Sequence, residues 1–245
     1  MDRAKKYLFY AVILLILAGA ALFIHEASTL RWYALYPEAS VGGAPHDTRA
    51  PYSAPGTAFS RPSGKNPMNA ADLAWILRER IALGVMERMA AGGAELAAYN
   101  ERVREYNRVA GAIEYRESDM LAAERLVEGL KGDIVRETDA EIMSVAIPLS
   151  VLNDDRASLV WQVQKYLNLL GYYPGEANGK ESKGTTSAVK MFELKSGVQV
   201  TGRIDERLSA ALREFWISRN IPVTVGFDGE GEELVRFGGG ETAGF

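Results

Sequence analysis

Few side chains in this 245-residue sequence are of the types that carry catalysis or bind metals. Cysteine is absent, which excludes disulfides, thiolate metal sites and cysteine nucleophiles. The two histidines, His25 and His46, both lie near the N-terminus, so we expect neither a histidine-based zinc site nor a serine–histidine relay. A hydrolase built on one glutamate is permitted by residue type but needs a cleft-forming fold that the periodic sequence does not suggest. We therefore expect no catalytic residues, no metal, no cofactor and no enzymatic activity.

The balance of charged residues limits the kinds of partner that the protein can bind. Lysine and arginine number 28 and aspartate and glutamate 32, which gives a formal net charge of −4. Nucleic-acid-binding proteins usually carry an excess of basic residues, so we expect no nucleic-acid partner. The hydrophobic share of 47% and the charged share of 24% are those of a folded protein with one or two domains and linkers.

The N-terminus predicts a membrane segment. Residues 1–6 form a basic tail that holds Arg3, Lys5 and Lys6, and residues 7–24 carry no formal charge. As a helix, this apolar run spans roughly 27 Å, close to the hydrocarbon thickness of a bilayer. The basic tail favours a cytoplasmic N-terminus, with the bulk of the chain on the other side. The alternative is a cleaved signal peptide.

A linker and a helical arm follow. Residues 37–67 hold six of the nine prolines, which is typical of an extended linker. Residues 69–145 form the predicted arm, with Asn69 as the N-cap of its first helix. The arm contains three apolar stretches with helical spacing and charged residues on their other faces, as in coiled coils and helical hairpins. The first stretch is one stripe, Leu73, Leu77, Ile81, Val85 and Met89.

The arm has two possible arrangements. Contacts between chains through Tyr99, Val103 and Tyr106 would make the protein a homo-oligomer. Contacts within one chain would make the arm a monomeric spacer. The sequence leaves both open.

Residues 155–217 form the third predicted unit, a bundle of three short helices. Gly171 ends the first helix, Thr185 or Thr186 caps the second, and Asp205 caps the third. A core of this size is marginal alone, so we expect neighbouring segments to pack on it. Residues 221–245 complete the chain as a small β-hairpin and a tail. The fold class is therefore mainly α.

The spacing in this bundle resembles the peptidoglycan-binding family 1 domain. The matching residues are Val163, Gln164, Leu167, Leu170, Gly171, Tyr172, Tyr173, Asn178, Gly179, Thr185, Ala188, Val189, Phe192, Gly197, Val198, Thr201, Gly202 and Asp205. Asn178 stands where the family usually has aspartate, Ser182 where it has glycine and Glu193 where it has glutamine. The resemblance implies a three-helix module that binds the bacterial cell wall.

The resemblance also implies a binding surface at the turn after the first helix. Its candidate residues are Tyr172, Tyr173, Asn178, Lys183 and Thr185. Tyrosine rings stack on sugars, and amides and hydroxyls bond their hydroxyl groups. The alternative is that the two tyrosines only hold the turn against the bundle. The ligand can be the glycan or the stem peptide.

These segments predict a non-catalytic peptidoglycan-binding tether or scaffold of the bacterial cell envelope. We expect a single-pass protein of the inner membrane, with its N-terminus in the cytoplasm and its bulk in the periplasm. One alternative is a subunit of an envelope complex that uses the helical arm and the C-terminal module for assembly with other proteins. Another alternative is an accessory factor of a separate murein hydrolase.

Overall fold

The computed structural model describes residues 59–62, 66–110, 113–227 and 233–237. This part of the chain is mainly helical, with seven helices and one two-stranded sheet. None of its helices combines the length and the apolar character needed to cross a membrane. The predicted basic tail, the membrane segment at 7–24 and most of the predicted linker lie outside the described residues.

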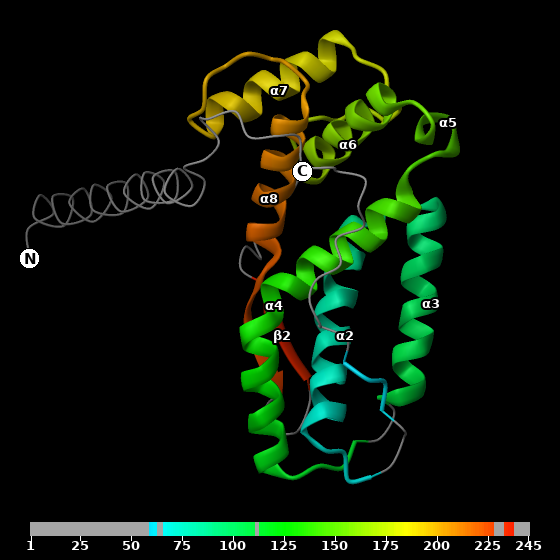
Figure 1. Ribbon diagram of the computed structural model, residues 1–245, viewed down its shortest axis with the longest axis vertical. Coiled ribbons are helices and arrows are strands. Elements are labelled where there is room, and N and C mark those ends of the chain that lie inside the picture. Colours follow the sequence, from blue (N-terminus) through cyan, green and yellow to red (C-terminus); the bar gives the residue numbers. More distant parts are fainter. Residues whose placement is uncertain (1–58, 63–65, 111–112, 228–232, 238–245) are drawn as a thin grey trace, which may run out of the picture. The chain divides into compact units, whose positions relative to one another are not determined.

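The elements follow one another along the chain as labelled in Figure 1. They are α2 (Ala70–Met89), α3 (Gly93–Val109), α4 (Glu117–Ala146), α5 (Leu149–Leu152), α6 (Asp155–Leu169), α7 (Lys183–Lys195), α8 (Glu206–Asn220), β1 (Pro222–Phe227) and β2 (Glu233–Phe237). The described residues up to Phe192 and from Thr201 onward belong to one compact unit, and residues 193–200 belong to a second. In the described part of the second unit, the Val198 N–H bonds the Glu193 carbonyl at 3.1 Å in the turn that follows α7.

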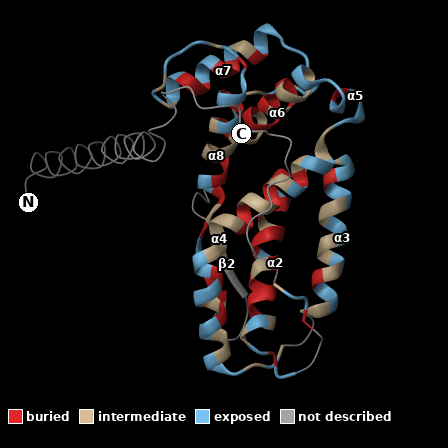
Figure 2. Cartoon of the chain, in the orientation of Figure 1, coloured by how far each residue is buried: buried red, intermediate tan, exposed pale blue. Residues whose placement is uncertain are grey.

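Helix α2 is the centre of the arm. It begins at Asn69, whose Oδ1 accepts from the N–H groups of Ala71 at 2.8 Å and Asp72 at 3.1 Å, which confirms the predicted N-cap. The predicted apolar stripe is buried, but so are residues on the other faces of the helix, such as Trp75 and Met86 (Figure 2). The prediction of one stripe was too narrow, because α3, α4 and both strands contact α2.

Helices α3 and α4 pack on α2 within one chain. The three residues that we considered for contacts between chains pack within this chain. Tyr106 is buried in its core, and Tyr99 and Val103 are half-buried against the same core. Helix α4 is continuous over 30 residues and passes through Gly129 and Gly132. The described arm is therefore a folded-back arrangement of three helices.

The hairpin forms as predicted and belongs to the arm. Strands β1 and β2 are antiparallel, from Pro222 opposite Phe237 to Phe227 opposite Glu233. The Phe237 ring lies so close to α2 that a Cβ on Gly84 would come within 2.5 Å of it. The Phe227 N–H donates to Glu124 Oε1 of α4 at 3.1 Å. Segments more than 100 residues apart in the sequence thus share one core.

The C-terminal module is built on α6, α7 and α8. Asp154 and Asp205 cap α6 and α8 by accepting from Ala157 N–H at 3.0 Å and Leu208 N–H at 2.9 Å. Helix α7 begins before either predicted cap, since the Ser182 hydroxyl accepts from the Thr185 N–H at 3.1 Å. This position corrects the expectation that Thr185 or Thr186 would cap the helix.

The module packs against the arm, as its small core led us to expect. The carboxylate of Asp139, fully buried in α4, accepts from the Tyr166 hydroxyl at 3.0 Å and from Arg213 Nε at 2.7 Å. Burial raises the pKa of Asp139 against the opposing influence of Arg213, and burial with the Asp139 charge raises the pKa of Tyr166. A buried ion pair between Lys165 of α6 and Glu95 of α3 adds a second polar link.

Candidate functional site

One buried amide fixes the turn between α6 and α7. Gln164 Oε1 accepts from the N–H groups of Asn178 and Gly179, both at 3.0 Å. Its Nε2 donates to the Lys180 carbonyl at 2.9 Å and to Thr185 Oγ1 at 3.1 Å. The Gln164 side chain is fully buried, and these four bonds satisfy its amide completely. The amide thereby links α6 to the turn and to the first turn of α7.

The turn itself requires its Asn-Gly pair. Asn178 Oδ1 accepts from the Lys180 N–H at 2.9 Å, a short-range bond that stabilises the bend. Gly179 has a φ of +72°, and a Cβ there would lie 2.8 Å from the Ala157 carbonyl oxygen and 2.8 Å from Val151 Cγ1. Asn178 is exposed, but its side-chain oxygen is already hydrogen-bonded within the turn.

The two tyrosines differ in their surroundings. Tyr172 packs edge-on against Phe192, with ring centroids 5.7 Å apart, and so contributes to the module core. Tyr173 covers two glycines: a Cβ on Gly175 would come within 2.6 Å of its ring, and one on Gly184 within 3.6 Å. Both rings are half-buried. Both therefore hold the turn in place and keep part of their surface exposed to solvent.

Of the other two candidate residues, only Lys183 can reach a ligand. It is exposed at the start of α7, next to the glycine that Tyr173 covers. Thr185 is completely buried, and its hydroxyl is engaged with Gln164 and with Ser182 Oγ at 2.9 Å. Thr185 thus supports the turn from inside, which corrects its assignment to the binding surface.

Two features of this region have only a weak signal in the sequence. The first is the clamp by Gln164, whose signal is a glutamine among apolar residues on the buried face of an amphipathic helix. The second is a group of exposed cations that includes Lys180, Lys190 and Arg203 as well as Lys183. Its signal is the excess of basic over acidic residues between positions 180 and 203.

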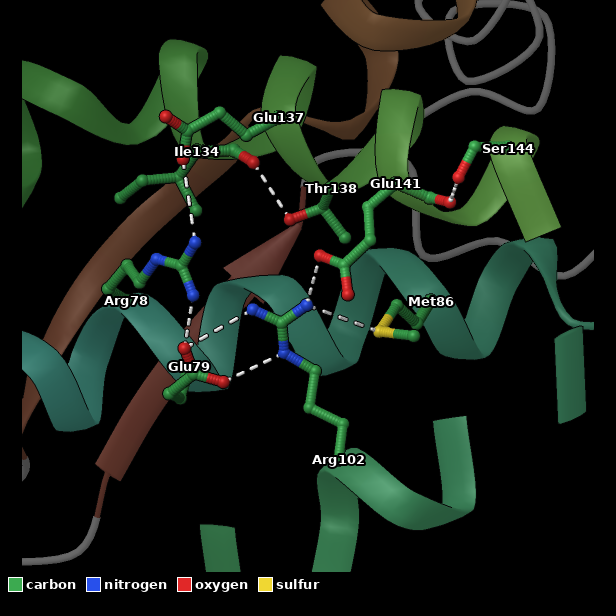
Figure 3. A network of polar contacts seen from close by, with 9 residues as sticks. All are labelled: Arg78, Glu79, Met86, Arg102, Ile134, Glu137, Thr138, Glu141 and Ser144. Atoms are coloured by element: carbon green, nitrogen blue, oxygen red, sulfur yellow. Dashed lines mark hydrogen bonds and ion pairs between the residues drawn. The ribbon is translucent and has the colours of Figure 1, made fainter. Parts of the chain in front are cut away.

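A separate polar cluster connects the three helices of the arm (Figure 3). Arg102 of α3 binds Glu79 of α2 through two bonds of 2.8 and 3.2 Å, and Glu141 of α4 at 2.6 Å. Arg78 pairs with Glu79 and reaches Glu137 at 3.5 Å. Burial alone would raise the pKa of Glu79, but the two arginines outweigh it and hold that pKa below its usual value.

This cluster is an ionic link between helices. The charged residues in Figure 3 are all arginines and glutamates, which pair with one another across the three helices. In the described part of the chain, no group of histidine, cysteine, aspartate and glutamate side chains is arranged to hold a metal ion.

Comparison with known proteins identifies the module. Residues 156–212 match the family model described as "Putative peptidoglycan binding domain", in agreement with the resemblance noted from the sequence. No curated protein and no solved structure matches the chain. The matched segment contains the turn clamped by Gln164 and all five candidate binding residues.

Proposed function

We propose that this protein is a non-catalytic tether or scaffold that is anchored in the bacterial inner membrane and binds peptidoglycan. The observation that carries the proposal is the match of residues 156–212 to a peptidoglycan-binding domain. The turn after α6, which the Gln164 amide holds through four hydrogen bonds, presents Tyr173 and Lys183 and supplies a surface for the wall polymer.

The membrane part of the proposal rests on the sequence. The uncharged run at 7–24 is long enough to cross a bilayer, and the basic residues before it favour a cytoplasmic N-terminus. The module would then lie in the periplasm, at the end of a proline-rich linker and the helical arm.

Co-sedimentation with purified peptidoglycan sacculi tests wall binding. The full chain, kept in solution with a mild detergent, should pellet with sacculi and stay in the supernatant with cellulose. Cellulose is the control because it is an insoluble polysaccharide without amino sugars or peptides. A chain that pellets with neither polymer would contradict the proposed function.

Membrane fractionation tests the anchor separately. The chain should stay with the membranes during an alkaline carbonate wash, which removes peripheral proteins. Protease added to spheroplasts should digest the module, since we place it outside the cytoplasm. Release by the wash, or complete protection from the protease, would contradict the topology and leave wall binding unaffected.

A further inference from the structure

We propose that Lys180, Lys183, Lys190 and Arg203 form a cationic surface that binds the carboxylates of peptidoglycan stem peptides. This inference rests on the proposed wall-binding function and names the part of the wall polymer that the module recognises. The cationic surface is defined by these four residues, which belong to α7 and to the turns on either side of it.

The charge distribution is the first argument. Between residues 180 and 203 there are five basic and two acidic residues, a net charge of +3 in a chain whose net charge is −4. Of the two acids, Glu181 is paired with Arg156, and Glu193 is buried and not part of the exposed surface. The members of the cationic surface are all exposed, and none forms an ion pair with a described residue.

Side-chain contacts hold the backbone that carries these cations. The carbonyl and N–H groups of Lys180 are held by Gln164 and Asn178. The alkyl chain of Lys190 lies along Gly202, where a Cβ would come within 2.6 Å of Lys190 Cε. Arg203 follows that glycine directly, which brings its backbone close to the Lys190 side chain.

The distance between Lys183 and Lys190 allows the cationic surface to bind more than one carboxylate. Lys183 and Lys190 are seven residues apart in α7 and therefore lie on one face, roughly 10 Å apart along the helix axis. Backbone positions that far apart leave room for each ammonium group to bind a carboxylate of its own. Helix stability does not explain Lys183, since a cation in the first turn of a helix is unfavourable beside the positive end of the helix dipole.

Wall chemistry indicates which component fits. The glycan strands of peptidoglycan are chains of neutral amino sugars, whereas the stem peptides carry free carboxylates. Ammonium and guanidinium groups bind carboxylates through charge-assisted hydrogen bonds, which neutral hydroxyl groups do not match. Tyr173, packed on Gly184 beside Lys183, adds a partly exposed ring for the rest of the ligand.

The test compares sacculi before and after their carboxylates are converted to neutral amides with a carbodiimide and an amine. The full chain in mild detergent should bind untreated sacculi, and amidation should reduce this binding about tenfold or more. The variant K183Q/K190Q should bind untreated sacculi roughly tenfold more weakly, as expected from about three- to fivefold for each exposed charge pair lost. Salt should weaken binding of the unmodified chain, because the charges are exposed.

Two control variants isolate the effect of charge at this surface. K183R/K190R keeps both charges and should bind like the unmodified chain. R125Q removes an exposed cation from α4 of the arm and should also leave binding unchanged. Chitin, a neutral polymer of N-acetylglucosamine, should not bind the chain.

The outcomes separate this inference from the proposed function. Equal binding to untreated and amidated sacculi, or undiminished binding of K183Q/K190Q, would overturn the cationic surface and leave the wall-binding function standing. No binding of the unmodified chain to untreated sacculi would overturn both. Tight binding to chitin would assign recognition to the glycan instead.

Discussion

Gln164 is the residue on which the geometry of the candidate site depends most. Replacement of Gln164 by methionine keeps the volume of the side chain but leaves two N–H groups and one carbonyl without their partner, while the Thr185 hydroxyl keeps its contact with Ser182. Each buried polar group left unsatisfied costs about 1–3 kcal/mol, and part of this cost is recovered when water enters the turn. We expect Gln164→Met to lower the free energy of unfolding by about 2–4 kcal/mol, measured by urea denaturation.

Gln162→Met is the matched control on the same helix. The Gln162 side chain is half-buried, and its oxygen accepts one long bond of 3.4 Å from Ser209. Its replacement should cost less than about 1 kcal/mol. Equal urea midpoints for Gln164→Met and the unmodified chain would show that the clamp is dispensable.

Local sequence signals predicted the turn of the candidate site, but they did not predict which of its side chains are buried. The Asn178–Gly179 pair marks a turn by its residue types alone, because a positive φ favours glycine. Thr185 has a polar side chain in a turn region, so the sequence favoured exposure. It is buried because Gln164, 21 residues earlier in the sequence, supplies a donor for its hydroxyl. Such a pairing between two helices has no local signature.

Among the elements, α3 depends most on ionic contacts, since Glu95 and Tyr106 are its only buried residues. The pKa of Glu79, which binds Arg102 of α3, is held below its usual value of 4.5. A carboxylate with a lowered pKa contributes stability above its usual pKa and loses it as the pH falls through its folded value. Acidification below about pH 4.5 should therefore weaken the attachment of α3.

Glu79→Gln tests this contribution. Near neutral pH the variant leaves Arg102 partly buried without its main partner, and we expect a loss of about 3 kcal/mol in the free energy of unfolding. The difference from the unmodified chain should shrink in urea titrations repeated at successively lower pH, because Glu79 of the unmodified chain then becomes protonated. Glu101→Gln, which removes an exposed pair with Arg104, should change stability little at any pH. A deficit of Glu79→Gln that does not vary with pH would contradict the ionic link.

The periodic pattern of apolar residues predicted the helices of the arm, but it did not predict which elements pack against them. The stripe from Leu73 to Met89 identified α2. The apolar residues on the other faces of this helix did not indicate which elements would pack on them. Part of the cover is the hairpin at 222–237, more than 130 residues further along the chain. Patterns within one helix predict which residues seek burial, but the partner is set by the tertiary fold.

In the molecule as a whole, the C-terminal module and the arm share one hydrophobic core. The family match ends at residue 212, but α8 continues to Asn220, and its buried Trp216 and Ile217 belong to the same core as the arm. Asp139 of α4 closes this junction by binding Tyr166 and Arg213 of the module. The predicted boundary between the arm at 69–145 and the module at 155–217 therefore lies between residues that pack on one another, as the small core of the module led us to expect.

This shared core predicts that the matched segment does not fold alone. A chain restricted to residues 156–212 would expose Tyr166 and Lys165, leave both without their partners Asp139 and Glu95, and lose the second half of α8. So small a segment has a low free energy of unfolding, because it buries only a small share of its surface on folding. We expect it to show little helical circular dichroism and no cooperative urea transition, whereas the full chain in mild detergent unfolds cooperatively. A cooperative transition of the short segment would show instead that the module is autonomous, and that its contacts with the arm only orient it.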